Sequence, residues 1–560
     1  MGTRPARDRA PESPLSTLPQ QARRARPVVA LEALAPLPRW PLWLLCAIYV
    51  LPGFIGRDPW TAEGVAFGTI WQIASGHASW LHPTLYGSAV DGGWLAYWIG
   101  AASVRLLGAS LGTVLAARLP FALMLGLSMI QTWYAAYQLA RRDAALPVQP
   151  AFAPPIPARD YARAMADGAL LSLVACLGLL GRGHEIGPAL LQLTASSSLL
   201  LAAAWMSLAP WRAAALGALA LAALAGGGAP TLAFGALLAG AALLAHRALA
   251  GVRVQAALAL LVGAAALVVA WHAGARPLPS APWPTLGHDL GNAAWFLWPA
   301  WPLALWALWR WRASWTEWHV LAPAALLALT LLEGMRVSTR SGALLSALPP
   351  AALLAALALP VMRRGSLAAL DWFALMFFSL FAFVVWLLWL ATLTGFPRQP
   401  AANIARLAPG YHALLHPLPT LLALAATLAW TAVVAWRAGR HRHPLWKGMV
   451  LSAGGVTLVW VLVGTLWLPA LNYASTYRPL GRRLGAVLRT QAAGGVHCAG
   501  LSLAQQALLG YWSGADLGSG RHARYRLQHA DRRLPPDMRV LWRGHRPGEA
   551  DDAFVLLGPR

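Results

Sequence analysis

The chain has 560 residues, of which 58% are hydrophobic and only 11% are charged. A water-soluble globular protein has about 25% charged residues, so this composition excludes an ordinary soluble enzyme. The apolar residues form blocks of roughly 18 to 25 residues, the length that a helix needs to cross a bilayer. Such blocks must be helical, because a free backbone N–H or C=O has no partner in lipid. A membrane β-barrel would alternate apolar and polar residues, and runs such as 213–224 and 375–390 do not.

The basic residues indicate topology rather than a nucleic-acid partner. The chain carries 44 Lys and Arg against 20 Asp and Glu, a formal net charge of +24. In membrane proteins, Lys and Arg gather in cytoplasmic connections and fix the orientation of the helices. The three cysteines, Cys46, Cys176 and Cys498, show neither metal-ligand spacing nor a disulfide framework.

Residues 1–38 are rich in Pro and Arg and are expected to form a disordered, basic cytoplasmic arm. No cleavage site follows the first apolar run, which is therefore interpreted as an uncleaved helix. Apolar blocks then predict about 13 transmembrane helices within a domain over residues 39–469. The predicted helices are 40–56, 117–140, 166–182, 187–208, 212–226, 230–247, 254–272, 292–310, 317–334, 342–361, 369–394, 412–436 and 447–469.

Charge decides how these helices are oriented. The basic connections, among them Arg141–Arg142 and Arg437–Lys447, all fall on one side if the segment 93–108 does not cross the membrane. The Trp and Tyr residues of that segment suit a helix that lies along the membrane surface. Arg336 and Arg340 fall on the opposite side, where cations are disfavoured, so we single them out as functional candidates.

This orientation places four segments on the periplasmic side: the first loop 57–116, the turn at His184 and Glu185, the turn Gly226–Pro230, and the tail 470–560. Patterns in the tail predict helices at 477–489 and 504–512 and strands at 496–501, 525–529, 539–543 and 553–557. The expected fold class is an all-α polytopic membrane protein with a small C-terminal periplasmic α/β domain. We expect it in the bacterial inner membrane, with its N-terminus in the cytoplasm.

Two carboxylates, Asp58 and Glu63, lie just beyond the first predicted helix. A carboxylate at a membrane surface, shielded from bulk water, can act as a general base. The alternative is a solvated loop in which Arg57 forms an ion pair with Asp58. The spacing of the two carboxylates alone does not choose between these interpretations.

Three other periplasmic features are candidates. His184 and Glu185 form an ionisable pair between two apolar helices, which indicates function unless the turn is solvated and Arg182 neutralises Glu185. The glycines of Gly226–Pro230 permit close approach of backbone to a ligand, or simply form a turn. Arg336 and Arg340 could bind a lipid phosphate, since guanidinium groups bind phosphate in a bidentate manner. Anchoring at the membrane surface is the alternative for these two arginines.

The order of these motifs resembles the C-type (GT-C) membrane glycosyltransferases of family 39. That family includes the protein O-mannosyltransferases and the bacterial aminoarabinose transferases that act on lipid A. The matching stretches here are Ala62–Phe67, Trp71–Pro83, Asp91–Trp98 and Ala116–Pro120, of which the last matches fully as Ala-Ala-Arg-Leu-Pro. His184 and Glu185 correspond to the second acidic site of the family.

The chain departs from the family pattern at two lysines. Gly92 replaces the Lys before the Tyr-Trp motif, and Ala229 replaces the Lys in the turn that corresponds to Gly226–Pro230. In relatives the first of these lysines is thought to hold the donor phosphate. By resemblance, Arg57, Arg336 or Arg340 would replace it here, unless the chain uses a different donor or is an inactive paralogue.

The resemblance implies transfer of a sugar from a polyprenyl-phosphate donor to a periplasmic lipid, glycan or protein. Glu63 or Asp58 would be the general base, and Glu185 would position it or help to bind a divalent cation. No cofactor is certain, because the family does not uniformly need a metal. Asp91, Tyr97, Trp98 and Arg118 would line the cavity for donor and acceptor.

Two other functions remain open at this stage. A transporter of lipid-linked sugar would show repeat symmetry and charges inside several helices, and the sequence shows neither. A non-catalytic assembly protein of the cell envelope is compatible with the missing lysines. The expected partners are a polyprenyl-phosphate sugar, a periplasmic acceptor and membrane lipids, with no nucleic acid.

Overall fold

The computed structural model describes Pro27, Val29, Leu34 and residues 37–560, apart from 91–92, 149–155, 276–285, 338–341, 363, 439–444, 492–494, 519–522 and 548. Most of the predicted arm, 1–38, therefore lies outside the described residues. Within it, Val29 and Leu34 are buried against the hydrophobic core. These two side chains thus pack on the protein rather than extending into solvent.

Eight helical segments of the described chain are long and apolar enough to cross a membrane. They are α5 (Thr113–Ala140), α8 (Pro188–Trp205), α11 (Arg253–His272), α14 (Trp318–Val337), the segment Ala343–Val361 around α15 (Leu348–Ala358), α16 (Arg364–Thr394), α18 (Pro417–Ala438), and the segment Trp446–Thr490, with α19 (Val450–Leu462), α20 (Leu468–Ser475) and all but the last residue of α21 (Arg478–Gln491). The shorter apolar helices are α2 (Arg39–Phe54), α4 (Leu95–Leu111), α9 (Pro210–Gly226) and α10 (Pro230–Leu243). The chain is a multi-pass membrane protein, and the number of thirteen crossings stays a prediction.

The other helices show where the sequence misplaced boundaries. They are α3 (Thr61–Ser75), α6 (Ala158–Ala175), α7 (Leu177–Arg182), α12 (Leu286–Phe296), α13 (Ala300–Arg310) and α17 (Arg398–Leu407). The predicted helix 166–182 is wrong in extent: it begins at Ala158 and is broken by the extended backbone of Cys176. The predicted helix 292–310 is two helices, interrupted near Pro299, which has no backbone N–H to donate.

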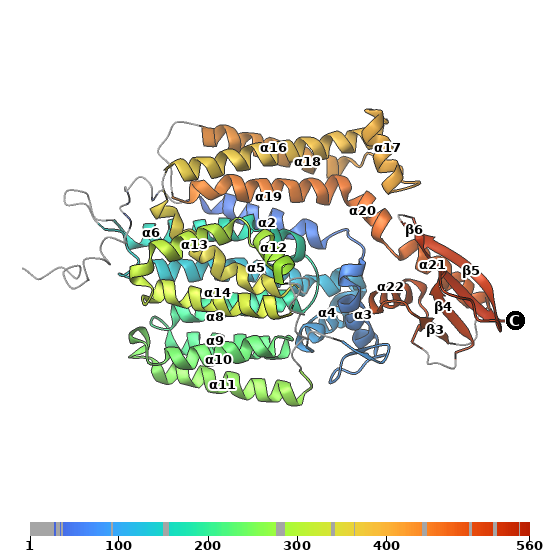
Figure 1. Cartoon of the computed structure of the whole chain (residues 1–560), viewed down its shortest axis with the longest axis horizontal. Helices are drawn as coiled ribbons and strands as arrows, with labels where there is room; N and C mark the ends of the chain where they lie inside the picture. Colours follow the sequence, from blue (N-terminus) through green and yellow to red (C-terminus); the bar gives the residue numbers. More distant parts are fainter. Residues whose placement is uncertain are drawn as a thin grey trace, which may run out of the picture.

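The bundle and the C-terminal unit lie end to end. The long helices run side by side along the long axis of the molecule, and a small sheet lies beyond one end of the bundle (Figure 1). Helices α3 and α4 lie at that same end, and α3 faces α22 (Leu503–Ser513) of the C-terminal unit (Figure 1). The first loop and the tail, far apart in sequence, therefore meet.

The C-terminal sheet has the strand order β3-β4-β6-β5. The strands are β3 (Val496–Ala499), β4 (Tyr525–His529), β5 (Met538–Arg546) and β6 (Glu549–Pro559). β3 and β4 are parallel and are connected through α22, as parallel strands require a crossover, whereas the other pairs are antiparallel. The predicted fold class, a helical membrane bundle with a small C-terminal α/β unit, is confirmed. The sequence did not predict the short hairpin of β1 (Thr84–Leu85) and β2 (Ser88–Ala89).

Small residues allow α22 of the C-terminal unit to pack closely on α3. Gly64 and Gly68 face Ala504 and Ala507 of α22, and a Cβ on Gly68 would lie 2.4 Å from the Cβ of Ala507. On the same face, the rings of Phe67 and Tyr511 meet edge to face at 4.8 Å. The contact is close packed, so the C-terminal unit has a fixed position over the first loop.

The first loop also packs on the turn that follows α9. Gly93 has a φ of +75°, and a Cβ there would lie 2.4 Å from both the carbonyl oxygen of Gly226 and the amide nitrogen of Gly228. The glycines of Gly226–Pro230 thus permit close approach of another part of the same backbone. The tight contact and the left-handed conformation both require glycine at position 93.

A Gly93→Ala substitution should therefore destabilise the folded state by about 2–4 kcal/mol, combining backbone strain with a backbone clash. Gly76→Ala is the matched control, because Gly76 has a φ of +82° and a Cβ added there would have no neighbouring atom within 4 Å. Gly76→Ala should lower the stability of the folded state only by the cost of the left-handed backbone conformation, about 1 kcal/mol. Unfolding by SDS in mixed micelles measures both, and equal losses would contradict the packing argument.

Candidate active site

A buried carboxylate, Glu63, lies in the first turn of α3. Its backbone N–H donates to the carbonyl of Trp60 at 3.1 Å, which starts the helix. A carboxylate in the first turn is favoured by the positive end of the helix dipole. Because Glu63 is only 2% exposed, its charge also requires specific partners.

Two arginines provide those partners. Arg57 Nη2 donates to Glu63 Oε2 at 2.9 Å, and Arg118 of α5 donates to Oε1. Arg118 also donates to the backbone carbonyls of Arg57 and Asp58, which ties the first loop to α5. The side chains of Arg57 and Arg118 are 9% and 2% exposed, so both guanidinium groups are engaged inside the protein.

His184 connects this cluster to the core of the bundle. Its carbonyl accepts a hydrogen bond from Arg57 at 2.9 Å, and its Nε2 donates to the carbonyl of Tyr49 at 2.9 Å. The ring stacks on Trp460 at 4.3 Å and lies against Gly53, where a Cβ would come within 2.2 Å. His184 is fully buried, so the interpretation of this turn as solvated is wrong for His184. Burial lowers the pKa of His184 to about 4.

Asp58 faces the C-terminal unit rather than the buried cluster. Its Oδ2 accepts a hydrogen bond from the hydroxyl of Thr476 at 2.8 Å, and its Oδ1 lies 3.8 Å from Arg478 Nη1. Its backbone N–H donates to the Asn472 side chain at 3.1 Å. The side chain of Asp58 is 20% exposed, more than that of Glu63. In place of the Arg57–Asp58 ion pair of the alternative interpretation, the structure has the pairs Arg57–Glu63 and Arg478–Asp58.

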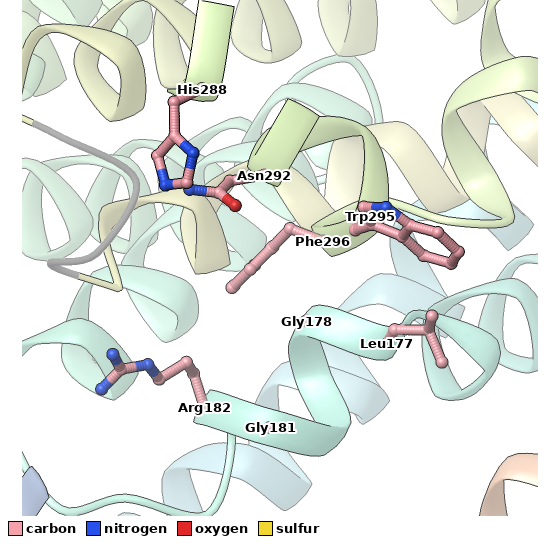
Figure 2. A pocket seen from close by; sticks show the side chains of 8 residues that line it. All are labelled: Leu177, Gly178, Gly181, Arg182, His288, Asn292, Trp295 and Phe296. Atoms are coloured by element: carbon pink, nitrogen blue, oxygen red, sulfur yellow. The ribbon is translucent and has the colours of Figure 1, made fainter. Parts of the chain in front are cut away.

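Glu185 pairs with Arg182, and Arg182 lines a pocket. They form an ion pair at 2.7 Å, and partial burial raises the pKa of Glu185. Arg182 lines a pocket of about 450 Å³ between α7 and α12. The lining residues are Leu177, Gly178, Gly181, Arg182, His288, Asn292, Trp295 and Phe296. His288 and Asn292 lie on the α12 wall and Arg182 lies across the pocket from them on α7, while Trp295 and Leu177 lie toward the other end (Figure 2). The pocket therefore has a polar end and an apolar end.

Arg336 belongs to a different cluster. It forms an ion pair with Glu333 at 2.8 Å, and both residues contact the hydroxyl of Thr231 in the first turn of α10. Of the residues expected to line a cavity, Tyr97 is buried, and the Trp98 indole donates to the carbonyl of Trp80. The two remaining candidates, Asp91 and Arg340, lie outside the described residues.

Sequence reasoning missed the residues that the distant parts of the chain bring to the site. Asn472, Thr476 and Arg478 meet the first loop more than 400 positions away in sequence. His288 and Asn292 lie on α12, and the helix predicted there, 292–310, began too late to include His288. The spacing of these residues along the chain matches no motif, so the sequence did not indicate that they belong to a site. Among the residues that the structure describes, no group of three or more His, Cys, Asp or Glu could hold a metal ion.

The fold is that of the GT-C membrane proteins. The structure is similar to that of ArnT from Cupriavidus metallidurans, solved bound to undecaprenyl phosphate, with a TM-score of 0.59 and 13% identity over 93% of this chain and 98% of that chain. The apo structure of the same ArnT gives a TM-score of 0.57 and 14% identity with the same coverage. No model of a protein family matches the chain, and no curated protein matches its sequence. The GT-C fold expected from the motifs is thus confirmed.

Loss of the Glu63 charge should lower the free energy of unfolding more than loss of the Glu185 charge does. Glu63→Gln leaves two buried guanidinium groups without their counter-ion, which costs about 3–5 kcal/mol. Glu185→Gln breaks a half-exposed pair, which contributes at most about 1 kcal/mol. SDS unfolding in mixed micelles gives both values. A smaller loss for Glu63→Gln than for Glu185→Gln would contradict the role of Glu63 as the structural centre.

Acidification should destabilise the protein through His184. The folded-state pKa is lowered from 6.5 to about 4, so the unfolded state binds more protons between these values and stability falls as pH decreases through this window. The full shift corresponds to roughly 3 kcal/mol. His184→Gln keeps a donor for Tyr49 and should show a flatter stability profile between pH 7 and pH 4. An unchanged slope in that variant would refute the assignment to His184.

Proposed function

We propose that the chain is a glycosyltransferase that takes a sugar from a polyprenyl-phosphate donor and transfers it to a periplasmic lipid, glycan or protein. The support comes from the fold, shared with a protein solved with undecaprenyl phosphate, and from the pocket beside the buried carboxylate cluster. The proposal places the protein in the bacterial inner membrane, with the arm 1–38 cytoplasmic. In this proposal, residues 39–469 form the membrane domain and residues 470–560 form the periplasmic domain.

The pocket between α7 and α12 is the proposed donor site, and it is the single observation that carries the function. A polyprenyl phosphate has a charged head and an apolar tail, which suits a pocket with polar and apolar ends. The leaving group is a phosphate, so it needs positive charge and hydrogen-bond donors rather than an acid. Arg182, His288 and Asn292 supply these at the polar end.

This assignment differs from the cations that the sequence suggested for the donor phosphate. Arg57 is buried and bonded to Glu63 and to the carbonyl of His184. Arg336 is paired with Glu333 and Thr231. Arg182 is also paired, with Glu185, but its side chain is 39% exposed and lines the pocket itself. It is therefore the cation best placed to replace the missing lysines.

Asp58 is the proposed general base, and Glu63 is a positioning residue. Asp58 has the more exposed carboxylate, at 20% against 1% for Glu63. Glu63 holds Arg118, which in turn holds the carbonyl of Asp58. In the proposed step the acceptor oxygen attacks the anomeric carbon, its proton passes to Asp58, and the carbon–oxygen bond to phosphate breaks with its electron pair leaving on the polyprenyl phosphate.

Turnover in nanodiscs tests this proposal, with a panel of polyprenyl-phosphate sugars and release of polyprenyl phosphate as the readout. Asp58→Asn should lower kcat by 10²-fold or more, roughly the contribution of a general base. Arg182→Gln should raise the donor KM about tenfold, since it removes a charged hydrogen bond. The controls are Asp531→Asn and Arg312→Gln, both at exposed positions.

The outcomes separate the competing functions. Normal turnover by Asp58→Asn with loss in folded Glu63→Gln would move the base to Glu63. No release from any donor by folded wild-type protein would overturn the enzyme proposal. Donor transport without release would then favour a transporter, and neither activity would favour a non-catalytic envelope protein.

A further inference from the structure

Helices α16 and α18 leave a groove between them at the edge of the bundle. Both helices pack on α19, where Gly455 makes room for Phe378 of α16, since a Cβ on this glycine would lie 2.1 Å from that ring. Trp430 of α18 lies over Gly454 and meets Phe378 edge to face at 6.4 Å. The groove encloses a cavity of about 440 Å³. It is lined by Ser379, Ala382, Phe383, Trp386, Thr427, Trp430, Thr431, Val434 and Ala435.

The walls of the groove are apolar, although several lining residues carry polar groups. The indole of Trp386 donates to Thr427 Oγ1 at 3.1 Å. The indole of Trp430 donates to Ser379 Oγ at 3.1 Å, and the hydroxyl of Thr431 donates to the helix backbone. The polar groups are thus used within the wall. Because an apolar cavity does not hold ordered water, a hydrophobic chain is the ligand that fits it.

The groove opens on a surface that meets lipid. Both α16 and α18 are long and apolar enough to cross a membrane. Large apolar side chains are exposed on them, among them Phe383 of the groove at 63% and Leu428 at 68%. In a bilayer this surface is covered by hydrocarbon. An empty groove would leave its lining atoms without dispersion contacts on one side, so a lipid chain that enters it is stabilised.

One end of the groove lies next to an arginine at headgroup depth. Ala435 lines the groove, and Arg437 is two residues further along α18, a rise of about 3 Å. The apolar segment of α18 that is long enough to span the membrane ends at Arg437. Arg437 forms an ion pair with Asp371 of α16. A guanidinium has five N–H donors, more than one carboxylate uses, so Arg437 can also bind a phosphate.

A second cation makes this end of the groove positive. Lys447 Nζ lies 4.2 Å from the ring centre of Trp436, the neighbour of Arg437. Arg437 and Lys447 together outweigh the carboxylate of Asp371. Trp436 is 49% exposed, and an exposed Trp at the end of a spanning helix is typical of the membrane–water interface. Basic pockets between transmembrane helices bind the headgroups of anionic lipids.

This end of α16 and α18 is remote from the proposed active site. The two helices are joined through α17, which lies on the side of the C-terminal unit, so their other ends point away from that unit (Figure 1). Asp58 contacts the C-terminal unit and therefore belongs to the opposite end of the bundle. A headgroup at Arg437 is thus not the phosphate of the sugar donor.

We propose that the groove between α16 and α18 binds one hydrocarbon chain of an anionic phospholipid, whose phosphate is bound by Arg437. The lipid comes from the leaflet at the end of the bundle away from the C-terminal unit. It fills the space between two helices that are otherwise held together through α19. This site goes beyond the proposed function and does not rest on it.

Photo-cross-linking in nanodiscs tests the inference. Phosphatidylglycerol and phosphatidylcholine, each with a diazirine on one acyl chain, are incorporated separately at the same mole fraction, and labelled peptides of the full chain are identified by mass spectrometry. Phosphatidylglycerol should label residues 379–386 and 427–435 about fivefold more than phosphatidylcholine does, as expected for one basic residue near an anionic lipid. Equal labelling by the two lipids, or no label on these peptides, would overturn the inference.

Two alanines of α18 give a matched pair of variants for the chain. Ala432 and Ala435 are both exposed, but only Ala435 lines the groove. Ala435→Phe should fill the groove and remove most of the label from residues 379–386, whereas Ala432→Phe should be labelled as wild type is. Equal labelling of the two variants would contradict binding of a chain in the groove.

The double variant Asp371→Asn, Arg437→Gln tests the headgroup. It keeps the net charge and replaces the ion pair with neutral residues, which proteins often tolerate. The preference for phosphatidylglycerol should disappear at unchanged melting temperature, and a preference that persists would show that Arg437 does not bind the phosphate. Undecaprenyl phosphate added at equal mole fraction should leave the label unchanged. If it removes the label, the groove is a polyprenyl site and the phospholipid assignment is wrong.

Discussion

The ion triad of Arg57, Glu63 and Arg118 holds the site together. A carboxylate removed from water is stable only when it is paired, so the two arginines and the segments that carry them must keep fixed positions. Those segments are the end of α2, the start of α3 and the first turns of α5. The carbonyl of His184, which accepts from Arg57, adds the turn before α8 to the same network. Four segments thus converge because one buried charge requires it.

Two ion pairs that are more exposed than the triad lie next to it. On one side, Arg182 and Glu185 lead to the amphipathic pocket between α7 and α12. On the other, Asp58 turns toward Thr476 and Arg478 of the C-terminal unit. Positive charge is accessible on both sides, whereas the central arginines are neutralised or bonded to carbonyls.

The sequence predicted the fold class, most helices and the strands of the tail, because apolar length and alternation are local properties. It also singled out Glu63 and His184, which are ionisable residues next to apolar blocks, whereas Arg118 was named only through the matching Ala-Ala-Arg-Leu-Pro stretch. It did not predict which arginine pairs with which carboxylate, since pairing depends on tertiary distance. Arg478 is one arginine among many in a basic tail, and only its contact with Asp58 distinguishes it. Asp91 and Arg340 stay predictions.

The contact of Asp58 with Asn472, Thr476 and Arg478 has a consequence for biosynthesis. A chain emerging from the ribosome inserts its first helix long before these residues are translated. The set of partners around Asp58 is therefore incomplete until the last hydrophobic segment and the start of the C-terminal unit have been made. A half-inserted chain lacks the residues that orient Asp58, so this corner of the protein is among the last parts to take its final form.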